Sequence, residues 1–289
     1  LFKKNRYDVV HAHNQACAFY SGLAAFLSGT SLNMVTEHSR HHIENRKKRI
    51  LEKKIISFIS DYWVVVSEHL YSKSLYSDNI SKKKLLLINN GIDIERFENA
   101  KRYLAESETV NLVMVSRLNT VKNHEMMLVA LSTLKDDSRS YHLTVVGDGP
   151  EREFLESKAK ELHLCDHVSF VGNSNNVAEY LASAHIFVMC SHSEGFPLSL
   201  LEAAASRLPV ILTETSNMSG FVQNQLNGII VEKTVESLVS GIKDCATNYD
   251  KSIEMAEKLF EAAKNGYSIE KTSKEYLNLY LSKLGRSAS

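Results

Sequence analysis

The chain has 289 residues, of which 44% are hydrophobic and 24% charged, a composition typical of a soluble globular protein with a large core. Lysine and arginine balance aspartate and glutamate at 34 each, which argues against bulk nucleic-acid binding. The charge is unevenly spread, because residues 1–100 hold 15 basic and 10 acidic side chains, leaving 19 and 24 for the rest. This asymmetry indicates two halves with different partners, and the length favours two domains.

The four cysteines lie far apart and form no Cys-x-x-Cys pair, which argues against a disulfide framework or a structural zinc. The longest apolar runs are far shorter than the roughly 20 residues that a membrane-spanning helix requires, and no signal peptide is recognisable. A cytoplasmic location is therefore expected. The chain begins with leucine rather than methionine and runs almost at once into a strand, so we expect that an N-terminal portion is missing.

Short apolar runs alternate with helical patterns through the first half of the chain. Strands are predicted near 8–12, 32–37, 62–66 and 84–88. The sequence Asn89-Asn90-Gly91 then predicts a turn, and the charged stretch 95–108 is typical of a link between the two halves.

Within this half, the segment ENRKKRILEKKIISFIS at 44–60 combines a helical pattern with dense basic charge. Its six basic residues are Arg46, Lys47, Lys48, Arg49, Lys53 and Lys54. Five apolar residues share one face of the expected helix: Ile50, Leu51, Ile55, Phe58 and Ile59. We expect this apolar stripe to pack on the sheet of its own domain. The cations then either remain solvated or make a weak, salt-sensitive peripheral contact with anionic lipid at the inner face of the membrane.

The second half shows the same alternation more strongly. Strands are predicted at 111–115, 143–146, 168–171, 186–190, 209–213 and 228–231. The tail from residue 251 is helical, with a break at Asn265-Gly266. This pattern predicts an α/β fold with a parallel sheet covered by helices on both faces. Such sheets bind ligands where strands end and helices begin, so the strand-to-helix turns are the places to look for chemistry.

Two of these turns carry candidate phosphate-binding features. In SRLNTVKN at 116–123, Arg117 and Lys122 are placed to neutralise a diphosphate, although two solvated loop charges would give the same pattern. In VVGDGPE at 145–151, Gly147 and Gly149 allow close approach of the backbone, which a tight turn alone also explains.

A third turn lies in SHSEGFPLSLLEAAASRLPVI, residues 191–211, where Pro197 occupies the first position of a helix expected over about 197–207. The free backbone N–H groups of that helix start attract an anion such as phosphate. Glu194 and Glu202 lie on either side, where each can accept hydrogen bonds from hydroxyls. This layout suits a nucleotide sugar, whose ribose and hexose flank a diphosphate. The alternative, in which Glu194 caps the helix and Glu202 is solvated, stays open.

In this order and spacing, the segments SRLNTVKN, VVGDGPE, VSFVGN and SEGFPLSLLEAAASRLPVI resemble the family 4 retaining glycosyltransferases of the GT-B type. Glu194 and Glu202 meet the Glu-x7-Glu signature of that family. The resemblance extends to DVVHAH at 8–13, VVVSEH at 64–69 and LINNGIDIERF at 87–97, and so covers nearly the whole chain.

The resemblance implies two Rossmann-like domains. Residues 1–105 would form a partial acceptor-side domain, 106–265 the nucleotide-sugar domain, and 266–289 a C-terminal helix that packs back on the first domain. The family's first domain usually begins with a strand and a Gly-rich loop of the acceptor site. Neither precedes DVVHAH, which puts acceptor binding by this chain alone in doubt.

The resemblance also implies roles for individual residues. Arg117 and Lys122 would hold the donor diphosphate, and Glu202 the ribose. Glu194 would lie near the transferred sugar. The backbone around the sugar and phosphate would come from Gly195, Phe196, Pro197 and Leu198. The backbone at Val171 would meet the nucleobase. His13 would face the transferred sugar from the acceptor side, although His11, His38, His41 and His42 lie nearby in the sequence and could be confused with it.

The expected activity is transfer of a hexosyl or N-acetylhexosaminyl group, with retention, from a nucleoside-diphosphate sugar to the hydroxyl of an acceptor sugar or lipid-linked sugar, in surface polysaccharide or glycolipid synthesis. No cofactor, metal or nucleic-acid partner is expected. Two alternatives remain open: a GT-B-fold sugar-nucleotide epimerase, and a non-catalytic nucleotide-sugar-binding subunit.

Overall fold

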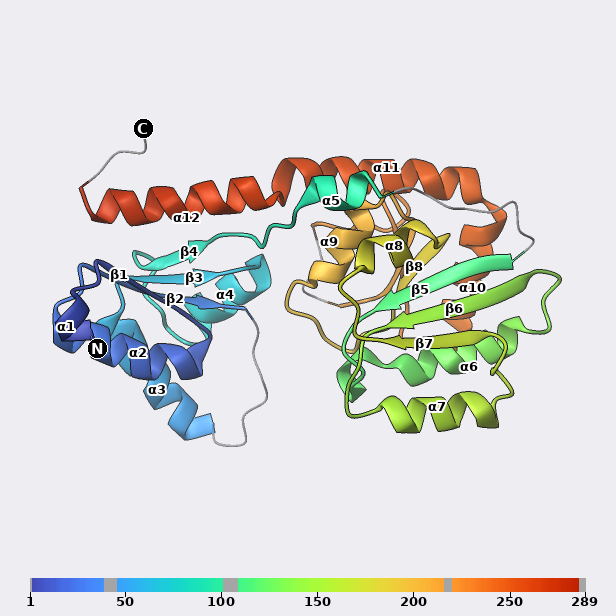
Figure 1. The fold of residues 1–289 in the computed structure, drawn as a ribbon, viewed down its shortest axis with the longest axis horizontal. Coiled ribbons are helices and arrows are strands. Elements are labelled where there is room, and N and C mark those ends of the chain that lie inside the picture. The colour runs from blue at the N-terminus through green and yellow to red at the C-terminus, as the bar shows by residue number, and fades with distance from the viewer. Residues whose placement is uncertain (1, 39–45, 101–108, 216–219, 286–289) are drawn as a thin grey trace. The chain divides into compact units, whose positions relative to one another are not determined.

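The computed structural model describes residues 2–38, 46–100, 109–215 and 220–285, and it divides the chain into two compact units (Figure 1). Residues 1–91 and 269–289 form the first unit, and residues 92–268 form the second. The sequence placed 92–105 in the first domain. In the structure this stretch contains helix α5 (Ile94–Glu98), whose Ile94 and Phe97 are buried in the core of the second unit.

The first unit is built on a parallel sheet of four strands in the order β1-β2-β3-β4. The strands are β1 (Val9–His13), β2 (Leu32–Glu37), β3 (Tyr62–Val65) and β4 (Leu85–Leu87). The helices are α1 (Phe2–Asn5), α2 (Gln15–Ser28), α3 (Arg46–Ile59), α4 (Glu68–Tyr76) and α12 (Ile269–Lys283).

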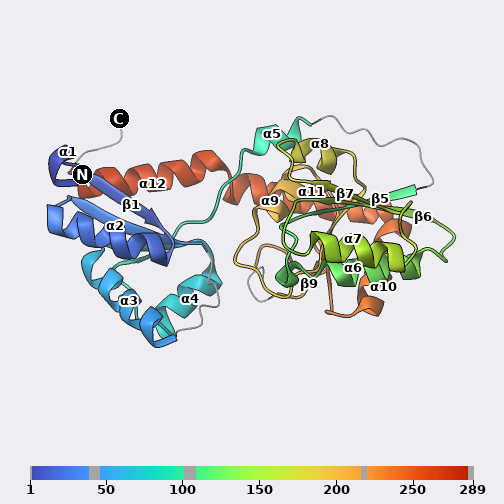
Figure 2. The same cartoon turned by 60° about the horizontal axis from the view of Figure 1, so that its bottom comes forward.

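Alternate residues of these strands face opposite sides of the sheet, as the period of a strand requires. One face, with Leu32, Met34 and Val64, packs against Tyr276, Leu279 and Tyr280 of α12. The other face packs against α2, α3 and α4 through a second cluster: Ala12, Ala18, Val35, Ile56, Trp63, Val65 and Leu70. Figures 1 and 2 show α12 on one side of this sheet and α2 and α3 on the other.

Helix α3 presents a different face to the sheet from the one predicted. The Lys53 ammonium is buried and bonds Glu37 at 2.9 Å and Asp78 at 2.6 Å, and Ile56, about one turn further along the same side, is buried in the cluster on this face of the sheet. This ion-paired lysine fixes the rotation of the helix. The predicted stripe is therefore wrong in part, because three of its residues are exposed: Ile50, Leu51 and Phe58. Lys53 does not belong to a surface patch of cations.

The second unit contains a parallel sheet of six strands in the order β10-β9-β8-β5-β6-β7. Its strands are β5 (Thr109–Val115), β6 (Ser140–Val146), β7 (Val168–Gly172), β8 (Ile186–Met189), β9 (Val210–Thr213) and β10 (Ile229–Val231). Besides α5, its helices are α6 (His124–Leu134), α7 (Arg152–Glu161), α8 (Val177–Ala182), α9 (Leu198–Ala205), α10 (Val235–Thr247) and α11 (Tyr249–Gly266).

Helices cover both faces of this sheet, and each face has its own apolar core. Leu112 and Met114 of β5 face a cluster that includes residues of α6, α7 and α10, whereas Val113 faces residues of α5, α8, α9 and α11. Figure 2 shows α6, α7 and α10 on one side of the sheet and α5 and α8 on the other.

The order in which strands are added to the sheet reverses beside β5, because β6 and β7 lie on one side of it and β8, β9 and β10 lie on the other. Ligands of open parallel sheets bind at such a reversal, in the crevice at the carboxyl ends of the two strands that flank it. The relevant loops therefore follow β5 and β8. They contain the two segments that carry Lys122 and Glu194.

Candidate functional site

The loop after β5 and the loop after β6 lie in direct backbone contact. The N–H of Leu118 donates to the carbonyl of Asp148 at 3.0 Å, and the N–H of Glu151 donates to the carbonyl of Leu118 at 3.1 Å. A Cβ atom on Gly149 would lie 2.2 Å from the carbonyl oxygen of Leu118, and one on Gly147 would lie 2.0 Å from that of Ser116. Both glycines are thus required by the approach of the neighbouring loop.

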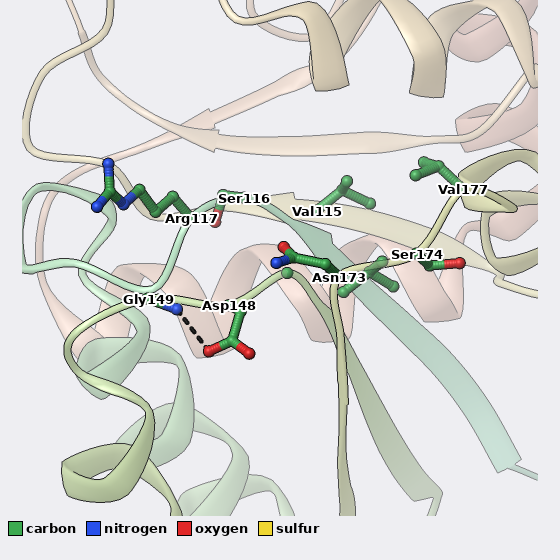
Figure 3. A pocket seen from close by; sticks show the side chains of 10 residues that line it. Val115, Ser116, Arg117, Asp148, Gly149, Asn173, Ser174 and Val177 are labelled. Atoms are coloured by element: carbon green, nitrogen blue, oxygen red, sulfur yellow. Dashed lines mark hydrogen bonds between the residues drawn. The ribbon is translucent and has the colours of Figure 1, made fainter.

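A cavity of about 660 Å³ opens beside these loops (Figure 3). It is lined by Val115, Ser116, Arg117, Val146, Gly147, Asp148, Gly149, Asn173, Ser174 and Val177. The volume falls in the range of small-molecule sites. In Figure 3 the Arg117 guanidinium and the Val177 side chain lie at opposite ends of the labelled residues. The cavity therefore offers a cation at one end and an apolar surface at the other.

Lys122 and Glu194, 72 residues apart in the chain, form an ion pair at the reversal point. The ammonium lies 2.6 and 2.8 Å from the two carboxylate oxygens. Ser191 donates to the same carboxylate at 2.5 Å, and the N–H of His192 donates to the carbonyl of Val121 at 2.8 Å, which joins the two loops. Glu194 is buried, so its charge needs this partner. The predicted diphosphate cation and the predicted sugar-side acid thus contact each other.

Aromatic rings pack against one another beneath the loop that leads into α9, on its core side. The ring of Phe196 is buried and stacks on Tyr267 with centroids 5.0 Å apart, and Phe221 packs against both rings. Pro197 is the N-cap residue of α9, which begins at Leu198, whereas the sequence predicted Pro197 at the first helical position. The side chain of Phe196 is therefore part of the core and does not project from this loop. Leu198 is exposed.

Glu202 is half-buried on α9. Burial raises the pKa of its carboxyl group, and the positive charge of Arg96 on α5 opposes that shift. Arg96 in turn donates to the carbonyl of Asn175 at 2.6 Å. Sequence reasoning assigned no role to Arg96, although it lies in the segment LINNGIDIERF that carried part of the resemblance.

Val171 lies in β7 and does not line the cavity, whereas Asn173 and Ser174 do. The pairing of β6 with β7 shifts register at this point, and Gly172 adopts φ 83°. This irregularity at the end of the strand places the residues after Gly172, rather than Val171, along the cavity.

A buried histidine that sequence reasoning missed lies behind the cavity. His124 is 3% exposed, and its Nε2 lies 2.9 Å from the hydroxyl of Ser116, which lines the cavity. Burial, together with the nearby charge of Lys122, lowers the pKa of His124 to about 4, so the ring is neutral at neutral pH. The sequence feature that could have drawn attention to His124 is its position directly after Lys122 and Asn123.

In the first unit, the three histidines at the ends of β1 and β2 have different surroundings. His11 lies between α12 and β2, with Nδ1 2.7 Å from the hydroxyl of Tyr280 and Nε2 2.8 Å from that of Thr36. Burial, with the neighbouring His13 and His38, lowers the pKa of His11 to about 4. His13 is exposed, and its Nδ1 lies 2.9 Å from Nε2 of His38. His41 and His42 lie outside the described residues.

Residues 95–266 match the family model described as "Glycosyl transferases group 1", and residues 1–96 match the model described as "Glycosyltransferase Family 4". The chain belongs to the group 1 glycosyl transferases. This glycosyltransferase is 26% identical over 278 residues to an uncharacterised glycosyltransferase of Haemophilus influenzae. The match covers 96% of this chain and 77% of the relative. This chain is 27% identical over 223 residues to the putative glycosyltransferase EpsF of Bacillus subtilis, covering 72% of this chain and 58% of EpsF.

Solved structures of other glycosyltransferases have the same fold as this chain. A glycosyltransferase from Rickettsia africae ESF-5 superposes with a TM-score of 0.82 at 22% identity, covering 99% of this chain and 79% of that one. Anabaena HepE, solved with UDP-glucose, superposes with a TM-score of 0.81 at 17% identity, covering 95% of this chain and 79% of that one. These likenesses confirm the predicted GT-B fold class of two α/β domains.

Among the residues that the structure describes, no group of three or more His, Cys, Asp or Glu side chains is placed to hold a metal ion. None of the helices in the described part of the chain is both long and apolar enough to cross a membrane.

Proposed function

We propose that this glycosyltransferase moves a sugar from a nucleoside-diphosphate sugar to an acceptor hydroxyl, with retention, in surface polysaccharide or glycolipid synthesis. The observation that carries the proposal is the Lys122–Glu194 pair at the reversal point of the second sheet, with Arg117 of the same loop as Lys122 lining the cavity. This arrangement provides cations for a leaving diphosphate and an acceptor for sugar hydroxyls in one place.

The names of two relatives support the substrate class. An Escherichia coli relative, 24% identical over 303 residues, is a UDP-Gal:alpha-D-GlcNAc-diphosphoundecaprenol alpha-1,3-galactosyltransferase. A Campylobacter jejuni relative, 28% identical over 234 residues, is an N-acetylgalactosaminyltransferase that acts on a diphospho-undecaprenol-linked sugar. Hexosyl and N-acetylhexosaminyl groups thus both occur among relatives. We infer a lipid-linked sugar as the acceptor of this chain.

Donor binding would rearrange the ion pair. Arg117 and Lys122 would neutralise the diphosphate, including the charge that develops on it as it leaves. When the ammonium of Lys122 turns to the phosphate, the Glu194 carboxylate is free to accept hydrogen bonds from sugar hydroxyls, since it is an acceptor only. The backbone of Gly195, Phe196, Pro197 and Leu198 would complete the cradle at the start of α9.

The ends of the nucleotide would be held by other groups. Glu202 would accept hydrogen bonds from both ribose hydroxyls, and the backbone from Val171 to Ser174 would face the nucleobase. Retention without a covalent intermediate requires the acceptor to attack from the side on which the diphosphate leaves, so that the diphosphate itself can take the acceptor proton.

The site needs no metal, in this proposal, because two fixed cations replace it. Transfer should therefore survive EDTA. Loss of all activity in EDTA, with recovery on addition of Mg²⁺ or Mn²⁺, would contradict this part of the proposal.

The experiment that tests the activity is a screen of nucleotide sugars with a lipid-linked or free sugar acceptor, followed by NMR of the product. The proposal predicts a glycoside with the anomeric configuration of the donor. An epimerised nucleotide sugar with no acceptor present would favour the epimerase alternative. Tight donor binding with neither transfer nor hydrolysis would favour the binding subunit.

We also propose a peripheral contact with anionic membrane through the first unit. Seven large apolar side chains are exposed on two helices that pack together, and we refer to them as the α2–α3 apolar surface: Tyr20, Leu23, Phe26, Leu27, Ile50, Leu51 and Phe58. The rings of Phe26 and Phe58 lie 6.3 Å apart, so the two helices contribute to one surface. Single exposed apolar residues are ordinary in soluble proteins, but a contiguous set marks an interaction surface.

The occupant is inferred from charge. Helix α3 begins with the sequence RKKR at 46–49, and Lys54 is exposed two turns into the same helix. A helix whose sequence is this basic and whose described apolar side chains are exposed suits the headgroup region of an anionic bilayer, where apolar side chains insert and cations contact phosphates. The sequence led us to expect contact through the cations alone, but the exposed residues add an apolar contribution.

A further inference from the structure

Ser116, the residue after β5, lines the cavity of the second unit, and its backbone is held on two sides. Its N–H donates to the carbonyl of Val146 at 3.0 Å, which continues the pairing of β5 with β6. Its carbonyl oxygen lies against Gly147, where a Cβ atom would approach it to 2.0 Å. What remains to be oriented is the side chain of Ser116, through its χ1 torsion and the position of the hydroxyl proton.

A buried histidine contacts that side chain from behind the cavity. His124 is the first residue of α6 and is 3% exposed, and its Nε2 lies 2.9 Å from Oγ of Ser116. The preceding residue, Asn123, adopts a left-handed conformation with φ 53°, which asparagine tolerates better than most residues. The chain turns there from the loop into the helix, and the ring of His124 meets Ser116 at this turn.

The second nitrogen of the ring indicates which of the two groups donates. Within the described ranges, Nδ1 of His124 is buried and has no hydrogen-bond partner. A neutral ring carries one proton, and on Nδ1 that proton would form a buried N–H without an acceptor, which folded proteins seldom contain. On Nε2 the proton is bonded to Oγ of Ser116, and only a lone pair is left unpaired. His124 therefore donates to Ser116, and the hydroxyl proton of Ser116 is available to a ligand.

Two features of the cavity favour an anionic oxygen as the acceptor of that proton. Arg117 lies beside Ser116 and brings a cation to the same end of the cavity (Figure 3). Asp148, the one carboxylate among the residues that line the cavity, is already ion-paired with Arg152 at 3.4 Å. A phosphate oxygen only accepts hydrogen bonds, so it fits a hydroxyl that has a proton to donate.

We infer that the Ser116 hydroxyl donates to a phosphate oxygen of the bound nucleoside diphosphate, and that His124 is the positioning residue that keeps this hydroxyl proton turned toward the cavity. The inference rests on the proposed function, which brings a diphosphate to Arg117. It adds a neutral donor to the cations of the site. A Ser116 hydroxyl that donated to His124 instead would present only lone pairs to the cavity and would disfavour a phosphate oxygen.

The first test measures affinity and separates the phosphates from the rest of the nucleotide. The diphosphates of uridine, guanosine, adenosine, cytidine and thymidine are titrated into the full chain by calorimetry, and the one that binds is compared with its own nucleoside. Ser116→Ala should bind the diphosphate about tenfold more weakly, the effect of one hydrogen bond to a charged group, and the nucleoside equally well.

Variants of His124 test whether it acts through Ser116. His124→Leu removes both ring nitrogens and keeps an apolar side chain in the core, and it should weaken diphosphate binding about threefold. His124→Gln should bind as wild type does, because its amide N–H can replace the Nε2–H. The double variant of Ser116→Ala and His124→Leu should bind no more weakly than Ser116→Ala alone, whereas losses that add would show that His124 acts independently.

The second test reads the ring proton directly. The full chain is labelled with ¹⁵N-histidine, and long-range ¹H–¹⁵N correlation at neutral pH should show His124, identified by its loss in His124→Gln, as the Nε2–H form. An Nδ1–H form would overturn the role of His124. This readout uses the wild type, so together with Ser116→Ala it decides the question even if His124→Leu fails to fold.

A second histidine–serine contact in the same unit provides the matched control. Nε2 of His142 also lies 2.9 Å from a serine hydroxyl, that of Ser169, and neither residue lines the cavity. His142→Leu should therefore bind the diphosphate as wild type does. Wild type that binds none of the five diphosphates would refute the proposed function itself. Wild type that binds one of them, with Ser116→Ala binding it equally well, would overturn this inference alone.

Discussion

Gly149 is required by the backbone of another loop. Because a Cβ atom there would lie 2.2 Å from the carbonyl oxygen of Leu118, Gly149→Ala must push the loop after β6 away from the loop after β5. We expect the variant to lose roughly 1–3 kcal/mol of stability, as overpacked sites do, and to bind a nucleoside diphosphate more weakly because the cavity is reshaped. Calorimetry and thermal unfolding measure both effects. Gly266→Ala is the matched control, since nothing lies within 4 Å of a Cβ there. A Gly149→Ala variant that behaves like this control would show that the loops yield without cost.

Arg117 and Lys122 were predicted as equivalent partners of a diphosphate, but the structure distinguishes them. Arg117 is exposed, whereas Lys122 neutralises the buried Glu194. Each Ala variant should weaken nucleoside-diphosphate binding by about 1.5–3 kcal/mol, the size of a charge-assisted bond. Lys122→Ala should also lower the melting temperature, because it leaves a buried carboxylate unpaired, while Arg117→Ala should not. Equal melting temperatures for the two variants would mean that the ion pair is not formed in solution.

Glu202 offers a test in which stability and binding change in opposite directions. Burial raises the pKa of its carboxyl group, so the folded state holds the proton more tightly than the unfolded chain. The cost of the buried carboxylate is absent below the unfolded pKa and reaches its full size once pH has risen through the folded pKa. Glu202→Gln should therefore raise the melting temperature at neutral pH, and the gain should vanish in acid.

The same variant should bind a nucleoside diphosphate about 10- to 100-fold more weakly, because the ribose loses a charged acceptor. Its affinity for free pyrophosphate, which has no ribose, should not change. Isothermal titration with the two ligands makes the comparison. A variant that loses both affinities equally would place Glu202 at the phosphates rather than at the ribose.

At the scale of elements, periodicity was sufficient for the strands and insufficient for the rotation of one helix. All ten predicted strands are present, because buried parallel strands are continuous apolar runs that stand out in a sequence. The face that α3 presents could not be predicted in the same way. Lys53 looks like a surface cation by composition, and only the positions of Glu37 and Asp78, which are distant in the sequence, make it a core residue.

The candidate site likewise has features that local sequence predicts and features that depend on distant residues. Local sequence was enough to place Glu194 and Pro197 in the turn that leads into α9, within one residue of the start of the helix. Contacts between elements could not, so neither the Arg96 charge near Glu202 nor the His124 contact with Ser116 was foreseen. Each joins residues whose relation depends on how helices pack against strand ends, which no local pattern records.

The α2–α3 apolar surface makes a prediction for membrane binding. Wild type should sediment with vesicles that contain anionic lipid, and binding should weaken but persist at high salt, because salt screens the cations and leaves the apolar contribution. The double variant Phe58→Ser and Leu51→Ser should lose the vesicle binding that persists at high salt. A variant in which Lys47, Lys48 and Arg49 are all changed to Gln should lose the additional binding that wild type shows only at low salt.

Helix α12 provides a control surface in the same unit, since Leu277 is exposed outside the α2–α3 apolar surface. Leu277→Ser should sediment as wild type does. Wild type that stays in the supernatant at low salt would refute the membrane contact. Formation of dimers that depend on Phe58 would instead assign this surface to a second copy of the chain.

For the whole molecule, the chain leaves the first unit after Gly91 and returns to it at Ile269. The two ends of the second unit meet: the N–H of Ile92 donates to the carbonyl of Tyr267 at 3.0 Å, and Ile92 forms a β-bridge with Ser268. The second unit is therefore an insertion whose entry and exit are adjacent, and it carries its own apolar cores on both faces of its sheet. Segments of this kind are tolerant of excision and transplantation.

Residues 92–268 can thus be treated as an exchangeable cassette. Replacing them with the equivalent segment of another group 1 glycosyl transferase alters the unit that contains Arg117, Lys122, Glu194 and Glu202, while the histidines of the first unit stay in place. A short linker across the adjacent ends would equally close the first unit without the insert. In the proposed function, nucleotide choice would thereby become a property that recombination can change in one step, through two cuts in the chain that lie side by side in the fold.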